Sequence, residues 1–329
     1  MTTESPVLVG DVGGTNARFA LAVPGRDRPQ LQRVEKLRAA EFASLQQAIR
    51  HYLQSVDERP QRAAIAVACP VNGDDIRLVN RAWSFNRREL ATILGMDQVL
   101  ILNDFGAAAR AVTALEPGEF ELLHGPGDDC LHPPISVIGP GTGMGMALLV
   151  DCPVHQWRVV ETEGGHASFA PLGSEERRIH DWLAARHGRV SIERALSGSG
   201  LAKIHAALAG MPVGRQETAE SDLREPADIV AAALGGEDRA ARAALARFCA
   251  ILGSVAGDTA LFHGARTVAI AGGIVPRFIP FLKSSAFRER FLDKGRFAAY
   301  LEKVSIVVVT HPEPGLLGAA LSHQDPSTS

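Results

Sequence analysis

Apolar residues recur at every second position on both sides of a glycine-rich turn near the start of the chain. An apolar run at 7–9 precedes the segment Gly10–Thr15, and alternating apolar residues at 19, 21 and 23 follow it. This pattern predicts a strand, a turn and a second strand. Glycines at 10, 13 and 14 let the backbone approach a ligand closely, and adjacent unpaired N–H groups form a concave anion site. We expect this turn to bind phosphate.

A second stretch, residues 135–150, repeats the plan, with Gly139–Gly143 as its turn. Neither turn is a Walker loop, which requires Gly-x-x-x-x-Gly-Lys-Ser/Thr before a helix. A single turn of this kind is more typical of an ordinary hairpin. Two of them, one in each half of the chain, favour a duplicated fold that holds one nucleotide between its halves.

A third pattern is an apolar strand, 99–102, that ends at Asn103 and Asp104 before an alanine-rich helix over 106–115. Polar side chains at the carboxyl end of a strand lie where open α/β sheets collect ligands. Asp is also a good helix cap, so Asp104 has a purely structural interpretation as well. The spacing of the residues alone does not decide between a ligand-binding role and a helix-capping role for Asp104.

Three further segments carry candidate chemistry. Glu163 and His166 flank a Gly-Gly turn and could line one polar cavity that binds hydroxyl groups, although single polar residues in loops are usually just solvated. Glu193 begins a short helix, where the helix dipole alone would favour an acid. The strand 267–270 runs into Gly272–Gly273, which leaves room for a flat group against the backbone.

Composition narrows the class of protein and its compartment. The 329 residues suffice for two domains, and they are 46% hydrophobic and 22% charged with a net charge of −3, which disfavours nucleic acid or an anionic membrane as partner. The N-terminus has no signal-peptide pattern, and no stretch approaches the ~20 apolar residues of a membrane span, so we expect a cytoplasmic protein. Four scattered cysteines without Cys-x-x-Cys spacing disfavour structural zinc and are expected to be free thiols.

Six motifs resemble, in order, those of the bacterial ATP-dependent glucokinase family of the hexokinase/actin-like ATPase superfamily. They are GDVGGTNARFALAV, LNDFGAAA, GPGTGMG, EGGHASFAP, ERALSGSGL and IAGGIVPRF, and the resemblance runs from Val7 to Gly318. One departure is Ser199, where many members have proline. The polar loop 210–225 has the weakest resemblance.

The resemblance implies an α/β fold of the two-domain actin-like ATPase (ribonuclease H-like) type. It has mixed sheets, a duplicated phosphate-binding hairpin and a cleft between the domains. The implied small domain covers residues 1–114 plus 305–329, and the implied large domain covers 115–304. A homodimer is also implied.

The implied activity is transfer of the γ-phosphoryl group of ATP to the 6-hydroxyl of D-glucose, which gives glucose 6-phosphate in the first step of glycolysis. Asp104 is the implied general base, and Asp11 would orient Mg²⁺ through water. The implied sugar-binding residues are Asn80, Asn103, Asp104, Glu163, His166 and Glu193. The implied nucleotide-binding residues are Gly10, Asp11, Val12, Gly13, Gly14, Thr15, Gly141, Thr142, Gly143, Gly272 and Gly273, the last two in the adenosine motif.

Three alternatives remain open at the level of sequence. The chain could be a non-catalytic sugar sensor of the same fold, although every catalytic position is filled, or a kinase for another hexose. An actin-like ATPase or a carboxylate kinase would share the two phosphate hairpins. Such proteins would lack the set of Glu163, His166 and Glu193, which therefore discriminates between the two classes.

Overall fold

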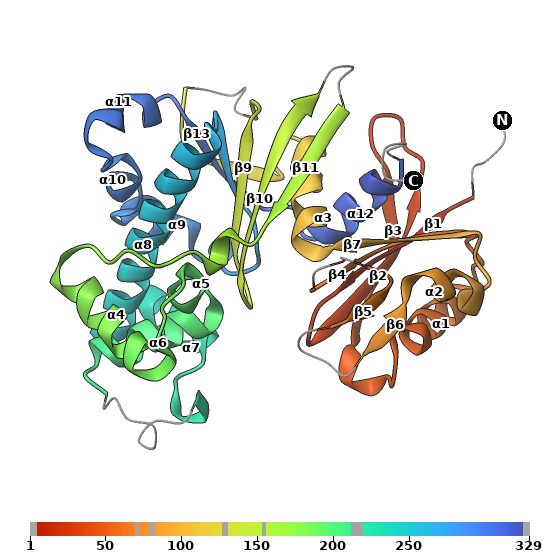
Figure 1. The fold of residues 1–329 in the computed structure, drawn as a ribbon, viewed down its shortest axis with the longest axis horizontal. Helices are drawn as coiled ribbons and strands as arrows, with labels where there is room; N and C mark the ends of the chain where they lie inside the picture. Colours follow the sequence, from red (N-terminus) through yellow and green to blue (C-terminus); the bar gives the residue numbers. More distant parts are fainter. Residues whose placement is uncertain are drawn as a thin grey trace. The chain divides into compact units, whose positions relative to one another are not determined.

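The computed structural model describes residues 5–69, 71, 73–78, 83–126, 131–152, 156–211 and 220–324. The chain divides into two compact units (Figure 1). The first unit comprises the chain up to Glu116 together with the segment from His311 onward, and the second unit comprises Pro117–Thr310.

The first unit is built on a five-stranded sheet with the order β3-β2-β1-β4-β7. Its main strands are β1 (Val7–Val12), β2 (Asn16–Val23), β3 (Gln30–Arg38), β4 (Arg62–Val67) and β7 (Gln98–Asn103), and a small ribbon is formed by β5 (Asp75–Arg77) and β6 (Ser84–Asn86). The helices are α1 (Leu45–Val56), α2 (Arg87–Leu94), α3 (Asp104–Ala111) and α12 (Pro314–Gln324). Helices α1 and α2 cover one face of the sheet, and α3 and α12 cover the other (Figure 1).

The second unit is built on a six-stranded sheet with the order β11-β10-β9-β12-β13-β8. Its strands are β8 (Phe120–His124), β9 (Ile135–Pro140), β10 (Met144–Cys152), β11 (Gln156–Thr162), β12 (Thr267–Ile270) and β13 (Ser305–Val309). Its helices are α4 (Gly173–His187), α5 (Ile192–Ala195), α6 (Gly198–Leu208), α7 (Pro226–Gly235), α8 (Arg239–His263), α9 (Ile279–Ser284), α10 (Phe287–Leu292) and α11 (Ala298–Leu301).

The five strands of the first sheet and five of the second share one topology, and β8 adds an antiparallel edge strand to the second sheet. In the first, β1 pairs antiparallel with β2 and parallel with β4; in the second, β9 pairs antiparallel with β10 and parallel with β12. In each case the strands at the centre are almost fully buried, as expected of a sheet covered on both faces. The predicted α/β fold with mixed sheets and a duplicated hairpin is therefore confirmed.

The strand β13 differs from the expected domain boundary. It pairs with β12 from Thr267↔Ser305 to Ile270↔Val308, and all its residues are buried in the second sheet. The sequence-based boundary placed residues 305–309 with the first domain. The sequence of a buried parallel strand does not indicate which sheet the strand joins, because its residues form one continuous apolar run whether it lies in the first sheet or in the second.

Helix α8 is the core helix of the second unit. Among the described residues it is the one helix whose length and composition would allow it to cross a membrane, although the apolar patterning gave no such expectation. Within the structure, 72% of its most apolar 18-residue stretch is buried, and its most extensive contacts are with α6, α7 and α10. Its small residues explain this packing: a Cβ on Gly253 would collide with the backbone oxygen of Phe287.

Candidate functional site

The first phosphate turn, Gly13–Thr15, connects β1 to β2. Its geometry is set by the amide of Gly13, which donates to the carbonyl of Asn16 at 2.9 Å. A Cβ placed on Gly13 would meet only that carbonyl, at 3.7 Å, and the Thr15 side chain is exposed. The outer surface of the turn is therefore open to an approaching group.

The second phosphate turn, Gly141–Gly143, connects β9 to β10 in the same way. The amide of Gly141 donates to the carbonyl of Gly143 at 2.8 Å, and a Cβ on Gly141 would meet nothing within 4 Å. Thr142 is exposed, as Thr15 is in the first turn. The amide of Gly198, at the start of α6, donates to the carbonyl of Gly141 at 2.9 Å and braces the turn.

Two predicted nucleotide-binding residues occupy packing positions. Gly10 is buried in β1, where a Cβ would lie 2.8 Å from Cδ1 of Ile65 and 3.1 Å from the ring of Phe19. Val12 is fully buried in the same strand. The core of the first unit thus requires glycine at position 10. The sequence pattern alone did not show whether the core or a bound ligand requires this glycine.

Asp11 is held in a small charged cluster. Its Oδ2 lies 3.4 Å from Nη1 of Arg18, and Nε of Arg18 lies 3.2 Å from Oε2 of Glu313. Burial raises the pKa of Asp11, and the charge and hydrogen bond of Arg18 oppose that rise. Burial also raises the pKa of Glu313. Arg18 and Glu313 were missed from the sequence, because nothing in it brings position 313 beside position 11.

Asn103 and Asp104 lie where β7 ends and α3 begins. The helix cap is Asn103: its Oδ1 accepts from the amides of Phe105 at 3.0 Å and Gly106 at 2.9 Å, and its Nδ2 donates to the carbonyl of Cys69 at 3.3 Å. Asp104 is the first residue of the helix, and its Oδ1 accepts from the amide of Phe105 at 2.8 Å. The capping role that sequence reasoning allowed for Asp104 therefore belongs mainly to Asn103.

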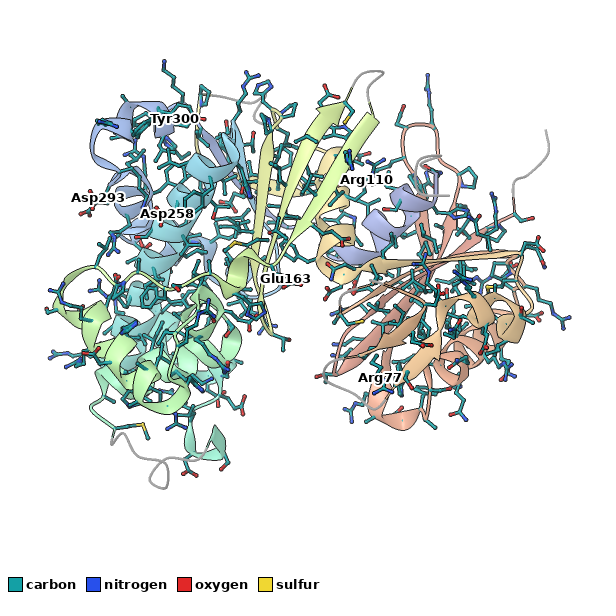
Figure 2. All side chains as sticks on the ribbon, viewed as in Figure 1. Arg77, Arg110, Glu163, Asp258, Asp293 and Tyr300 are labelled. Carbon is teal, nitrogen blue, oxygen red and sulfur yellow. The ribbon has the colours of Figure 1, made fainter. Side chains whose placement is uncertain are left out.

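The loop Glu163–His166, whose two polar end residues are predicted to bind the sugar and which we call the sugar clamp, follows β11. Figure 2 labels Glu163 where that strand ends. The side chains of Glu163 and His166 are 71% and 59% exposed, and Nε2 of His166 lies 3.8 Å from Oε2 of Glu163. The amide of His166 donates to the carbonyl of Glu163 at 2.9 Å, which closes a tight turn. Burial and the charge of Glu163 raise the pKa of nearby Glu161. The clamp therefore presents carboxylate and imidazole groups to solvent.

Glu193 lies on α5, whose N-cap is the hydroxyl of Ser191. The carboxylate of Glu193 turns toward the second phosphate turn, where its Oε2 accepts from the amide of Met144 at 3.0 Å. Sequence reasoning grouped Glu193 with the sugar clamp and did not foresee this contact.

The predicted adenosine motif, Gly272–Gly273, lies against the end of β9, directly before the second phosphate turn. Gly272 has φ +92°, and a Cβ there would lie 2.7 Å from the carbonyl oxygen of Pro140. Gly273 is exposed, with nothing within 4 Å of a Cβ position.

Asn80 lies outside the described residues. Trp83 is 4% exposed and donates its Nε1–H to the carbonyl of Phe42 at 3.1 Å, so it packs in the core of the first unit.

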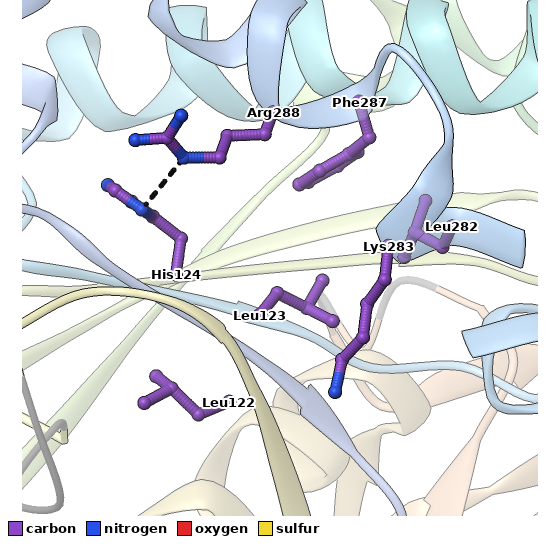
Figure 3. Close-up of a pocket in the computed structure, with 7 residues that line it drawn as sticks. All are labelled: Leu122, Leu123, His124, Leu282, Lys283, Phe287 and Arg288. Carbon is purple, nitrogen blue, oxygen red and sulfur yellow. Dashed lines mark hydrogen bonds between the residues drawn. The ribbon is translucent and has the colours of Figure 1, made fainter. Parts of the chain in front are cut away.

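A separate cavity of about 290 Å³ lies between β8 and helices α9 and α10 of the second unit (Figure 3). Its polar residues are His124, Lys283 and Arg288, and Nε of Arg288 donates to Nδ1 of His124 at 3.2 Å. The two cations are paired with Glu121 and Glu302. The cavity includes none of the predicted site residues, and its charges are already compensated.

A metal cluster is not found in the described parts of the chain: no group of three or more His, Cys, Asp or Glu side chains is positioned to hold an ion. Asp11 supplies one partly exposed carboxylate, with its side chain 22% exposed. A single carboxylate is enough for Mg²⁺ that arrives with phosphates and keeps several of its waters.

Comparisons with known proteins find relatives over nearly the whole chain. The family model for glucokinase matches residues 8–326. The glucokinase of Chromohalobacter salexigens is 44% identical over 318 residues, which cover 95% of this chain and 96% of that protein. The glucokinase of Chromobacterium violaceum is 43% identical, with 96% and 88% covered.

Solved structures share the fold of this chain. The crystal structure of a glucokinase from an Antarctic psychrotroph is 35% identical, with a TM-score of 0.82 and coverage of 98% of this chain and 99% of that one. A ROK family glucokinase from Streptomyces griseus, solved with glucose and AMPPNP, shares the fold at a TM-score of 0.60 and 18% identity, with 98% and 100% covered.

Proposed function

The chain belongs to the glucokinase family, and we propose that it transfers the γ-phosphoryl group of ATP to the 6-hydroxyl of D-glucose. The observation that carries this proposal is the presence, in one chain, of two open glycine-threonine turns and of the polar clamp at Glu163 and His166. Turn amides suit the phosphates of a nucleotide, and carboxylate and imidazole groups suit the neutral hydroxyls of a sugar.

The reaction needs alignment, charge neutralisation and a base for the hydroxyl. The 6-hydroxyl oxygen forms a bond to the γ-phosphorus while the bond from that phosphorus to the β,γ-bridging oxygen breaks, and ADP leaves. Asp104 accepts the proton of the hydroxyl. Its place in the first turn of α3 supports this role, because the helix dipole favours a negatively charged side chain there.

We assign the substrate contacts as follows. Asn80, Asn103, Glu163, His166 and Glu193 fix the sugar ring, whose hydroxyls match these donors and acceptors. The two phosphate turns hold the phosphates through their amides and threonine hydroxyls, and Gly272–Gly273 faces the adenosine.

Mg²⁺ is part of the nucleotide substrate and supplies neutralisation of phosphate charge. Asp11 would contact it through water. Arg18, 3.4 Å from the Asp11 carboxylate, fixes that carboxylate, and Glu313 balances the arginine charge.

We extend the proposal to a cytoplasmic homodimer. Cys69, Cys152 and Cys249 are free in the structure, which supports a reducing compartment. The dimer rests on the resemblance to the family alone. Sedimentation velocity over a range of concentrations would test it, and a single monomer species at every concentration would remove it.

The central test is MgATP-dependent phosphorylation by the purified protein of glucose, mannose, fructose and glucosamine in parallel. We expect turnover with glucose, and we expect Glu163→Ala to raise KM for glucose about 10- to 100-fold, since it removes charged hydrogen bonds to the sugar. Lys283→Gln, in the separate cavity, is the control and should leave KM unchanged. Turnover only with another hexose would reassign the substrate, and glucose binding without turnover on any sugar would favour the sensor.

A further inference from the structure

Glu193 fixes the end of the second phosphate turn. Its Oε2 accepts from the amide of Met144 at 3.0 Å, and Met144 is the residue that immediately follows the turn Gly141–Gly143. A Cβ on Gly143 would collide with the same oxygen, so the glycine is required for this contact. The orientation of the Glu193 carboxylate thus sets the position of the last peptide of the turn.

The sugar clamp packs on the other side of Met144. A Cβ on Gly165 would collide with the carbonyl oxygen of Met144, and one on Gly164 would lie 2.6 Å from Sδ of Met146. Met144 itself is 5% exposed. The two glycines between Glu163 and His166 therefore rest directly on the first residues of β10, and neither position has room for a side chain.

The backbone that carries Glu193 is tied to the clamp as well. The amide of Ile192 donates to the carbonyl of Ala167 at 2.9 Å, and Ser168 and Ser191 form a β-bridge. The guanidinium of Arg189 donates to the carbonyl of His166. With the backbone on both sides held, the Glu193 side chain is the adjustable connection between the clamp and the turn.

We propose that Glu193 is a positioning residue that couples sugar binding to binding of the nucleotide phosphates, an inference that rests on the proposed function. Oε2 holds the Met144 amide, whereas Oε1 has no hydrogen-bond partner among the described residues. A sugar hydroxyl bound at Oε1 fixes the carboxylate and, through Oε2, the second phosphate turn. By linkage, the sugar then raises nucleotide affinity and the nucleotide raises sugar affinity by the same factor.

The first test is calorimetric binding of β,γ-imido-ATP with Mg²⁺, measured without glucose and with saturating glucose. The ratio of the two Kd values is the coupling factor, and we expect at least about fivefold in the native protein. Glu193→Gln keeps an acceptor for the amide and should keep most of that factor. Glu193→Asp retains the charge but is one methylene shorter, so it cannot hold the amide and the sugar together, and its factor should fall toward one.

Glu163→Ala is the matched control, because Glu163 has no described hydrogen bond to the turn. It should weaken glucose binding but keep the coupling factor once glucose saturates. A Glu193→Asp protein with the native coupling factor would overturn the inference.

Hydrogen exchange supplies a readout that needs no nucleotide. Glucose should slow exchange of the Met144 amide in the native protein and in Glu193→Gln, and not in Glu193→Asp. If glucose fails to bind the native protein, the proposed function fails. If glucose binds and is phosphorylated while exchange at Met144 and the coupling factor do not respond, only the role of Glu193 fails.

Discussion

Gly315 lies directly against the carboxylate of Asp11. A Cβ on Gly315 would come within 2.8 Å of Cγ and 2.9 Å of Oδ2 of Asp11. Gly315 is the second residue of α12, and its φ is not in the left-handed region, so the requirement for glycine here is one of space. Asp11 is thus confined between this helix and Arg18.

Gly315→Ala should displace the Asp11 carboxylate. We expect kcat to fall about tenfold or more, which corresponds to about 1.4 kcal/mol of transition-state stabilisation, with little change in KM for glucose. The fold should persist, because alanine favours a helix by about 1 kcal/mol over glycine. Steady-state kinetics with varied MgATP checks this.

The matched control for this change is Gly235→Ala, at the end of α7, where a Cβ would meet nothing within 4 Å. It should leave kcat unchanged. A native kcat in Gly315→Ala would show that the position of Asp11 does not matter for turnover.

Asp104→Asn should remove turnover without loss of stability. Removal of a general base lowers kcat by about 10²- to 10⁴-fold, while the helix cap remains because Asn103 provides it. Asn103→Ala is the complementary change: it should lower the free energy of unfolding by about 1 kcal/mol through loss of the cap. Rapid-quench assays and urea unfolding of both variants measure the two effects. Near-native turnover in Asp104→Asn would exclude Asp104 as the base.

Much of the fold could be predicted from local pattern. The alternation around the two phosphate turns predicted two hairpins, and the structure has them as β1–β2 and β9–β10. Their repetition predicted a duplicated fold, which the matching order of five strands in each sheet confirms. The spacing of apolar residues and the residue types of a turn are local properties of the chain, so a single sequence is enough to predict them.

The contacts that connect distant segments could not be predicted. Arg18 reaches Glu313 only because α12 packs on β1. Glu193 reaches Met144 only because α5 packs on the turn Gly164–His166, which in turn packs on β10. An isolated acid in the sequence carries no signal of its partner. For the same reason, glycine at position 10 gave no indication that the core requires it. The catalytic and binding roles stay predictions.

The stability of the protein should decrease as pH falls below about 6.5, and His263 should contribute to this decrease. Burial lowers the pKa of His263, which forms a hydrogen bond of 3.0 Å with Oγ of Ser136. The unfolded state, with an ordinary pKa near 6.5, then binds more protons than the folded state. The stabilisation that neutral His263 contributes is complete above about pH 6.5 and decreases as the pH falls toward the folded-state pKa. Below that pKa it no longer changes with pH.

His263→Gln removes this titration. Its free energy of unfolding should depend less steeply on pH than that of the native protein as the pH falls below about 6.5, by at most about 1.4 kcal/mol per pH unit. Urea unfolding at a series of pH values measures the slope. Parallel profiles for the two proteins would contradict the assignment.

Glu176 is the buried centre of an ion-pair network that holds α4, α8 and α10 together. Its side chain is 1% exposed; Arg290 contacts both its oxygens, at 2.7 and 3.2 Å, and Arg247 contacts Oε1 at 3.3 Å. The amide of Leu172 donates to Oε2 at 2.7 Å. Arg290 also donates to Oγ of Ser254 at 3.0 Å. Each oxygen of the buried carboxylate is therefore fully used by the protein.

Glu176→Ala should lower the free energy of unfolding by about 3–5 kcal/mol, because it leaves the charge of Arg290, 12% exposed, without its partner. Glu175→Gln is the control on the same helix: that side chain is 55% exposed, and loss of its pair with Arg247 should cost at most about 1 kcal/mol. Changing both Glu176 and Arg290 to methionine should recover part of the loss, since neither buried charge then remains. Urea unfolding compares the three proteins, and equal losses in Glu176→Ala and Glu175→Gln would show that the network contributes little to stability.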